Sequence, residues 1–161
     1  MAALGSAAFL VLAPGVVAGL VPWLLTGWSD NGAPAAMQVA GALMIVAGVT
    51  ALLHAFARFV TEGRGTPAPV APTEGLVVGG LYRYVRNPMY VAVAAIIVGQ
   101  ALLLWRPGLL LYALAFGLAT STFARFYEEP VLRERYGSQY EEYRRAVPAW
   151  LPRRRPWRVK P

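Results

Sequence analysis

The sequence contains no cysteine, a single histidine (His54) and few charged residues. Without cysteine, disulfides, thiolate nucleophiles and cysteine-based metal sites are excluded. One histidine excludes metal sites built from several histidines and argues against histidine-dependent catalysis. Charged residues make up 14% of the chain, against about a quarter in a typical soluble domain. Together with a mean hydropathy of +0.47, this deficit indicates an integral membrane protein.

Several long runs of the chain are apolar and almost uncharged. A transmembrane helix needs roughly 20 such residues to cross the hydrocarbon core. The 161 residues suit one domain, so we predict an all-α integral membrane bundle over 1–161, with about four transmembrane helices and a C-terminal amphipathic cytoplasmic helix. The predicted spans are approximately residues 7–28, 35–57, 88–105 and 109–126.

The basic residues are distributed unevenly. Apart from Arg106, they lie in or beside the loop 62–86 or the tail 127–161. By the positive-inside rule the loop, the tail and both termini are cytoplasmic, in a cytoplasmic (inner) membrane. Three tryptophans fall near the opposite interface, where amphipathic rings settle: Trp23, Trp28 and Trp105. The net charge of +7 is therefore interpreted as topology, with membrane lipids and not nucleic acid as partners.

A basic, glycine-punctuated stretch ends at Arg86-Asn87-Pro88-Met89-Tyr90, where the third apolar run begins. Asn87 and Pro88 suit an N-cap and a first helical turn, so simple helix initiation is one interpretation. It does not explain why Arg86, Tyr82 and Tyr90 surround the same helix start. A helix N-terminus favours anions, and Arg86 would add a bidentate clamp. Anchoring of Arg86 to lipid headgroups is the alternative.

A second polar cluster, Glu128-Glu129-Pro130, ends the fourth apolar run. Acidic residues at a helix C-terminus oppose the helix dipole, so their presence needs a reason. Salt bridging with arginines is one, and recognition of a cation or of ribose hydroxyls is the other. Successive helical residues point about 100 degrees apart, so at most one of the two glutamates is expected to face a given ligand. Both polar clusters are predicted at the cytoplasmic face, where they can form one site reached from the lipid.

Residues 132–147 have the pattern of an amphipathic helix on the membrane surface. Glu141 and Arg145 are spaced for an i,i+4 ion pair on one side of it, and Gly137 is expected to break or bend it. Three tyrosines share another face at i, i+4, i+7 spacing: Tyr136, Tyr140 and Tyr143. This aromatic face either rests on the membrane or covers a pocket.

Three smaller features are candidates for function or assembly. His54, Arg58 and Glu62 form a stripe on the second run, and ionisable residues within a span are functional candidates. Only His54 lies at depth, because Arg58 and Glu62 can reach the interface. The pair Gly79-Gly80 permits close backbone approach to a ligand or a positive φ. Small residues on the second run permit two copies to pair as a homodimer: Gly41, Ala47 and Gly48.

Four motifs follow one another between about residues 75 and 152: Gly80 to Tyr90, Glu128 to Leu132, Tyr136 to Tyr143, and Val147-Pro148. In this combination they resemble the isoprenylcysteine carboxyl methyltransferase superfamily, which includes phospholipid N-methyltransferases. Members that methylate prenylated proteins typically have His where this chain has Asn87. Asn87-Pro88-Met89-Tyr90 is closer to phospholipid methyltransferases and to bacterial-type members of unknown substrate.

The resemblance implies S-adenosylmethionine as methyl donor and a lipophilic acceptor, either an isoprenoid or lipid carboxylate or a phospholipid amine. It also implies a cytoplasmic cofactor pocket, supported by Tyr136 and Tyr143. The implied cofactor-binding residues are Tyr82, Arg86, Asn87, Pro88, Tyr90, Glu128, Glu129 and Tyr140. Arg86, Asn87 and Tyr90 among them are the predicted catalytic residues, and no metal site is expected.

Methyl transfer from a sulfonium chiefly needs positioning and exclusion of water, so the lack of an enzymatic nucleophile is no objection. Two other classes stay open: a small membrane reductase using NADPH, because the superfamily resembles sterol reductases, and a non-catalytic lipid-binding membrane module. The chain is short for such a reductase and offers no additional dinucleotide-binding segment. Ligand binding distinguishes the three classes: S-adenosylmethionine, NADPH or neither.

Overall fold

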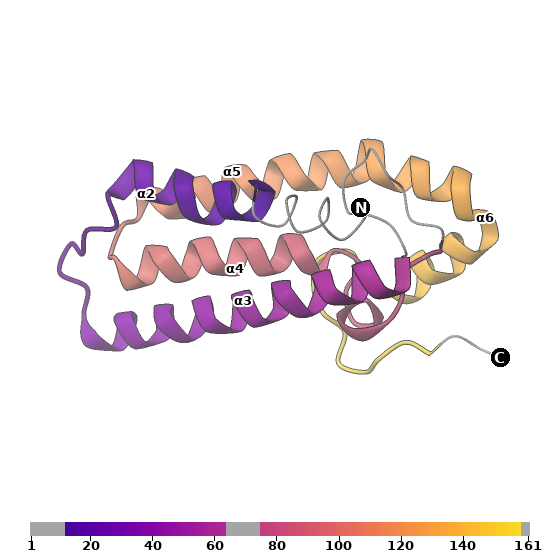
Figure 1. Cartoon of the computed structure of the whole chain (residues 1–161), viewed down its shortest axis with the longest axis horizontal. Coiled ribbons are helices and arrows are strands. Elements are labelled where there is room, and N and C mark those ends of the chain that lie inside the picture. The colour runs from indigo at the N-terminus through magenta and orange to yellow at the C-terminus, as the bar shows by residue number, and fades with distance from the viewer. Residues whose placement is uncertain (1–11, 64–74, 159–161) are drawn as a thin grey trace.

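The computed structural model describes residues 12–63 and 75–158, which form helices and turns without any strand. The principal helices lie along the long axis of the molecule (Figure 1), and the predicted all-α bundle is confirmed. Along the bundle the elements are the π-helix η1 (Val16–Leu20), α2 (Val21–Thr26), α3 (Ala35–Gly63), α4 (Pro88–Leu103) and α5 (Gly108–Phe123).

α4 is the central helix, packed between α3 and α5. Glycines allow α3 to approach it closely: a Cβ on Gly41 would lie 2.5 Å from the carbonyl oxygen of Gly99, and one on Gly48 would lie 2.7 Å from Ile96 Cγ1. The prediction that Gly41 and Gly48 offer a surface to a second copy was wrong, because α4 of the same chain already covers them. Ala47 is exposed, and homodimer formation stays a prediction.

Near Pro22, at the start of α2, the backbone of the N-terminal segment is hydrogen-bonded to neighbouring helices. Proline has no N–H, so Pro22 cannot donate a hydrogen bond to the carbonyl of Ala18, four residues earlier. That carbonyl instead accepts a 2.7 Å hydrogen bond from Gln100 Nε2 on α4. The adjacent carbonyl of Val17 accepts a 2.8 Å hydrogen bond from the Tyr112 hydroxyl on α5. The carbonyls of Val17 and Ala18 are thus satisfied by side chains of two other helices, as an apolar surrounding requires.

The outer surface of the bundle is apolar over much of its length. Leu43, Leu53, Leu111 and Leu118 are each more than half exposed, an arrangement that fits contact with lipid. The helices long and apolar enough to cross a membrane are Ala35–Glu62 and Gly108–Ala146, and the shorter apolar ones are Leu12–Thr26 and Pro88–Leu103. Residues 7–11 of the first predicted span and 64–74 of the predicted loop lie outside the described residues. The four-span topology and its orientation stay predictions.

The fourth apolar run and the tail helix form one continuous helical stretch. α5 passes through the π-helix η3 (Ala124–Glu128) directly into α6 (Glu129–Ala146). The predicted break at Gly137 is confirmed: its φ of 51° and ψ of −124° are non-helical, in a region that favours glycine. The chain reverses direction there and returns toward the bundle (Figure 1).

This reversal changes the ion pairs of α6. Glu141 lies 2.8 Å from Arg133 and 3.4 Å from Arg144. The predicted pairing with Arg145 was wrong, because the break at Gly137 brings Arg133 from the preceding part of the helix against Glu141. Ideal helical spacing across residues 132–147 could not anticipate this partner.

The segment before α4 contains the short 3-10 helix η2 (Gly80–Arg83). Gly79 N–H donates a 2.9 Å hydrogen bond to the Glu62 carboxylate on α3. Gly80, with φ of 54°, packs so closely on α3 that a Cβ there would lie 2.7 Å from His54 Nε2 and 3.0 Å from Arg58 Cγ. His54, Arg58 and Glu62 on α3 therefore pack directly against the glycine pair.

The C-terminal tail holds the same segment from the other side. Arg86 N–H and Asn87 N–H donate to the carbonyls of Pro148 and Ala149 at 2.9 and 3.2 Å. Trp157 N–H likewise donates to the Arg83 carbonyl at 2.9 Å. The entrance to α4 is thus clamped between α3 and the tail.

Candidate functional site

Arg86 stands at the start of α4 and connects it to α6. Its Nη1 donates hydrogen bonds to Glu129 Oε1 at 2.8 Å and to the Tyr140 hydroxyl at 3.0 Å. The side chains of Arg86 and Glu129 are 12% and 17% exposed, so this ion pair is largely shielded from solvent. A shielded pair holds its geometry more firmly than a surface pair does.

Asn87 occupies the N-cap position of α4, and Pro88 follows in its first turn. The Asn87 side chain makes no capping hydrogen bond. Helix initiation therefore accounts for Pro88 but leaves the side chain of Asn87 without that role. This side chain instead lines the two cavities described below.

Tyr90 lies in the first turn of α4, and its hydroxyl donates a 2.7 Å hydrogen bond to Glu128 Oε1. Glu128 is the last residue of the π-helix η3, and Glu129 is the first of α6. Single π-helical turns are frequent at functional sites because they re-aim side chains within a helix. Here adjacent glutamates reach different partners, Tyr90 on α4 and Arg86 just before it.

A first cavity of about 390 Å³ opens beside these contacts. Both Glu128 and Glu129 line this cavity, and the expectation that at most one of them faces a given ligand stays a prediction. All eight predicted cofactor-binding residues line it: Tyr82, Arg86, Asn87, Pro88, Tyr90, Glu128, Glu129 and Tyr140.

The first cavity has an apolar part as well as this polar one. Val17 from η1, Val93 from α4 and Phe116 from α5 belong to its wall. These residues come from the faces of the helices that bury the core of the bundle. One cavity therefore joins a charged end to a lining suited to hydrocarbon.

A second cavity of about 510 Å³ lies on the other side of the Arg86–Glu129 pair. It shares Arg86, Asn87, Ala124 and Glu129 with the first cavity. The rest of its lining consists of Ser121, Ala149, the aromatic residues Phe126 and Trp150, and three further arginines: Arg125, Arg133 and Arg144.

Comparison with known proteins identifies the family. Residues 36–139 match the sequence model of phospholipid methyltransferases, which is more than half of the chain. The chain belongs to the phospholipid methyltransferase family. No curated protein and no solved structure matches it.

Members of this family are membrane methyltransferases that act on lipid or isoprenyl substrates. The superfamily predicted from the four motifs is thereby confirmed. The matched region begins in α3 and ends in α6 before Tyr140, so it includes Arg86, Asn87, Tyr90 and both glutamates. The tail that clamps the site lies beyond it.

The charged end of the first cavity fits the donor that the family generally uses. S-adenosylmethionine carries a carboxylate, an ammonium group and ribose hydroxyls. Arg86 offers a guanidinium whose Nε is buried and has no hydrogen-bond partner among the described residues. Glu128 and Glu129 offer carboxylates in the same cavity. Each polar group of such a donor has a complement there.

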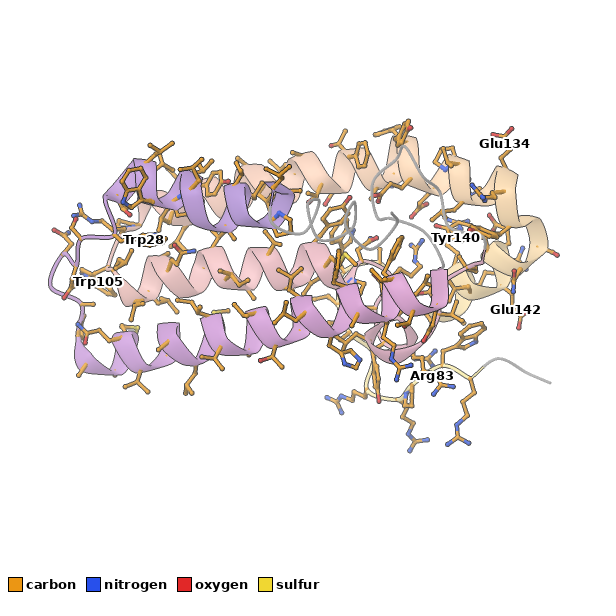
Figure 2. All side chains as sticks on the ribbon, viewed as in Figure 1. Trp28, Arg83, Trp105, Glu134, Tyr140 and Glu142 are labelled. Atoms are coloured by element: carbon orange, nitrogen blue, oxygen red, sulfur yellow. The ribbon has the colours of Figure 1, made fainter. Side chains whose placement is uncertain are left out.

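Tyrosines support this end of the site. Burial raises the pKa of the Tyr82 phenol, so the phenol stays neutral, and its ring packs against Phe59 with centroids 6.5 Å apart. The Tyr143 hydroxyl donates a 2.7 Å hydrogen bond to the Tyr82 carbonyl. Tyr136 and Tyr143 line the first cavity together with Tyr140. Figure 2 shows Tyr140 at the same end of the molecule as Arg83, far from Trp28 and Trp105.

Sequence analysis missed Trp150, whose ring stacks on Tyr90 with centroids 6.2 Å apart. It also missed the apolar wall from η1 and α5. The only local signal for Trp150 was an aromatic residue flanked by prolines in the tail. His54 lines neither cavity, and among residues 12–63 and 75–158 no cluster of His, Asp or Glu is arranged to hold a metal.

Proposed function

We propose that this protein is an S-adenosylmethionine-dependent methyltransferase whose acceptor is a lipophilic molecule of the membrane. The observation that supports it best is the first cavity, which joins the Arg86, Glu128 and Glu129 cluster to an apolar wall from three helices. A donor with several charges needs the first part. An acceptor that partitions into lipid needs the second.

Arg86 binds the carboxylate of the donor, through the Nε that is unpaired and the Nη1 that now contacts Glu129. Glu129 binds the donor's ammonium group, and Glu128 its ribose hydroxyls. Tyr90 keeps Glu128 in position through its 2.7 Å hydrogen bond. Tyr140 accepts a hydrogen bond from Arg86 at 3.0 Å and thereby fixes the orientation of the guanidinium group.

When bound, S-adenosylmethionine supplies an electrophilic methyl group. The chain's own residues orient the two reactants and exclude water from between them, which is the main requirement of an in-line displacement. A carboxylate acceptor attacks without losing a proton. An amine acceptor releases one, and Glu128 and Glu129 are the carboxylates in the wall of the first cavity that can take it.

We further propose that this end of the bundle faces the cytoplasm, where the donor is made and dissolved. The basic residues of the described tail lie at this end together with Arg83 (Figure 2), as the positive-inside rule requires. The acceptor then reaches the first cavity sideways from the lipid, past the exposed apolar faces of α5 and the N-terminal segment.

The test is calorimetric titration of S-adenosylmethionine and S-adenosylhomocysteine into the full chain in nonionic detergent. We expect saturable binding of both, weakened at least about tenfold in Glu129→Gln, which loses a charge-assisted contact. Glu142→Gln is the matched control, since Glu142 is exposed on the same helix and lies outside both cavities. It should bind like the parent.

A folded parent protein that binds neither ligand overturns the proposal, and NADPH is then titrated to test the reductase class. Normal binding by Glu129→Gln, with an unchanged melting temperature, removes Glu129 from the donor site. Transfer of a labelled methyl group from the donor into the organic phase of a membrane lipid extract completes the assay, since soluble acceptors stay in the aqueous phase.

A further inference from the structure

Trp150, in the C-terminal tail, contacts the candidate site although it lies beyond the region 36–139 that matches the family. Its ring stacks on the ring of Tyr90, with centroids 6.2 Å apart and planes inclined by 28°. Trp28 and Trp105, at the opposite end of the bundle (Figure 2), are 55% and 43% exposed, which suits rings at a membrane interface. Trp150 is half-buried, so its ring has a partner within the protein.

Backbone hydrogen bonds fix the position of Trp150. On both sides of it the tail pairs with the residues that precede α4: Arg86 N–H with the Pro148 carbonyl at 2.9 Å, Asn87 N–H with the Ala149 carbonyl at 3.2 Å, and Arg153 N–H with the Tyr84 carbonyl at 2.9 Å. Tyr90 lies in the first turn of the same helix. The tail therefore presents Trp150 to Tyr90 in a defined register.

The Tyr90 ring is in contact with two aromatic rings from different segments. Trp150 stacks on it from the tail, and Phe116 of α5 meets it edge to face, with centroids 6.4 Å apart and planes inclined by 70°. Stacked and edge-to-face pairs are the favoured arrangements of aromatic rings. With its ring held in this way, Tyr90 directs its hydroxyl to Glu128 Oε1 at 2.7 Å.

Trp150 also separates the Tyr90 ring from the second cavity. Trp150 lines the second cavity, whereas Tyr90 and Phe116 line only the first. A smaller aliphatic side chain at position 150 would remove the stacked partner and give the Tyr90 ring room to turn. A hydrogen bond weakens steeply when its donor turns away from the acceptor, so the hold on Glu128 would be lost with the stacking.

We propose that Trp150 is a positioning residue for donor binding. It keeps the Tyr90 ring in place, and the Tyr90 hydroxyl in turn keeps the Glu128 carboxylate directed at the ribose hydroxyls of the donor. Trp150 does not line the first cavity, so it acts through Tyr90 and not on the donor itself. Supporting residues of this kind commonly decide how firmly a contact group is held. This inference deepens the proposed function and rests on it for the role of Glu128.

The experiment compares two ligands by calorimetric titration into the full chain in nonionic detergent: S-adenosylhomocysteine and its 2′,3′-dideoxy analogue, which lacks both ribose hydroxyls. The ratio of their dissociation constants isolates the contact with the ribose, because the ligands share every other group. We expect the parent to bind S-adenosylhomocysteine at least about tenfold more tightly, as for a hydrogen bond to a charged group. Trp150→Leu should lower this ratio to less than about threefold, because Glu128 is then no longer held toward the ribose.

Tyr90→Phe tests whether the effect passes through the tyrosine hydroxyl. It removes the hydrogen bond to Glu128 directly and should lower the ligand ratio as far as Trp150→Leu does. The double variant should show no further reduction, because both substitutions abolish the same contact. Trp150→Phe retains a ring that can stack and should keep a ratio above about fivefold. A double variant whose ratio falls more than about twofold below either single variant overturns the action through Tyr90.

Trp157→Leu is the matched control. Trp157 is a half-buried tryptophan of the same tail, packs on Tyr143 with centroids 5.4 Å apart and lines neither cavity. Its replacement should lower the melting temperature, as Trp150→Leu does, but leave the ligand ratio at the parent value. An equal loss of the ratio in Trp157→Leu overturns the role of Trp150, since loosening the tail would then be enough. If Trp150→Leu yields no folded protein, Trp150→Met, which retains more of the volume, takes its place.

The same titrations separate this inference from the proposed function. A parent that binds S-adenosylhomocysteine with a ratio that Trp150→Leu leaves unchanged overturns the positioning role and keeps the donor site. A parent that binds both ligands equally tightly also overturns it, since Glu128 then makes no contact with the ribose. A folded parent that binds neither ligand overturns the proposed function, and the positioning role with it.

Discussion

The two ends of the bundle are closed by different kinds of contact. At the end marked by Trp28 and Trp105 (Figure 2), the closing side-chain hydrogen bonds are exposed, both the short-range ones and the contact of Arg106 with Ser29. Asp30 Oδ1 accepts hydrogen bonds from Gly32 and Ala33 N–H groups at 3.0 Å. At the opposite end the hydrogen bonds are buried or partly buried, and they join residues 38 to 61 positions apart.

The charges differ in the same way. Arg106 at the tryptophan end donates to Ser29 from exposed positions, with Nη2 and Oγ 2.6 Å apart. Arg86 at the other end is shielded, with Glu129 and Tyr140 as partners. The comparison indicates that one end only turns the chain, whereas the other keeps charged groups in place for a ligand. Four substitutions test this difference.

Arg86→Ala should have the largest effect. It leaves the shielded Glu129 carboxylate with only the longer contacts to Arg133 and Arg144, each at 3.9 Å, and breaking one side of a buried ion pair costs up to about 3–5 kcal/mol. We expect a strongly lowered melting temperature and no measurable binding of S-adenosylhomocysteine. Arg83→Ala is the control, because Arg83 is exposed. Parent-like stability and binding in Arg86→Ala would abolish the distinction between the two ends.

Gly137→Ala should be the next most damaging change. The φ of 51° and ψ of −124° at this residue disfavour a side chain by about 1–3 kcal/mol, and relief of the strain would straighten α6 and withdraw Tyr140 and Tyr143. Gly27→Ala at the other end also has positive φ, 58°, and should cost about 1–2 kcal/mol. Thermal melting compares their stability, and only Gly137→Ala should weaken donor binding. Equal loss of binding in both would contradict this.

Tyr143→Phe removes the 2.7 Å hydrogen bond to the Tyr82 carbonyl and leaves that buried carbonyl unsatisfied. The expected loss is about 1–2 kcal/mol of stability, with donor binding weakened only moderately. Tyr84→Phe, whose hydroxyl makes no hydrogen bond within the described part of the chain, should change neither. The melting temperatures of the two variants measure this difference in stability. Equal values would show that the hydrogen bond from α6 to the Tyr82 carbonyl does not stabilise the protein.

Arg106→Ala should have the smallest effect. Its contacts with Ser29 are exposed, and exposed polar pairs contribute less than about 1 kcal/mol. We expect nearly parental melting and unchanged titration with S-adenosylhomocysteine. A loss of donor binding in this variant would show that the two ends of the bundle are coupled, and would contradict the view that the tryptophan end only turns the chain.

Much of the fold follows from the sequence. Apolar runs and the glycine at 137 indicate where helices lie and where α6 breaks, because both depend on local conformational preference. The continuity of α5 and α6 was missed, since a π-helical turn such as Ala124–Glu128 has no reliable local signal. The assignment of Gly41 and Gly48 to contact with a second copy was wrong, because small residues serve contacts within and between chains equally well.

The sequence by itself determined the apolar helical character, the order of the polar motifs and which residues lie at helix ends. Only the tertiary structure decided that both glutamates line one cavity, that Trp150 stacks on Tyr90 and that arginines gather in a second cavity. The physical reason is one of range. Helix formation depends on neighbours within a few residues, whereas the walls of a cavity come from segments that only packing brings together.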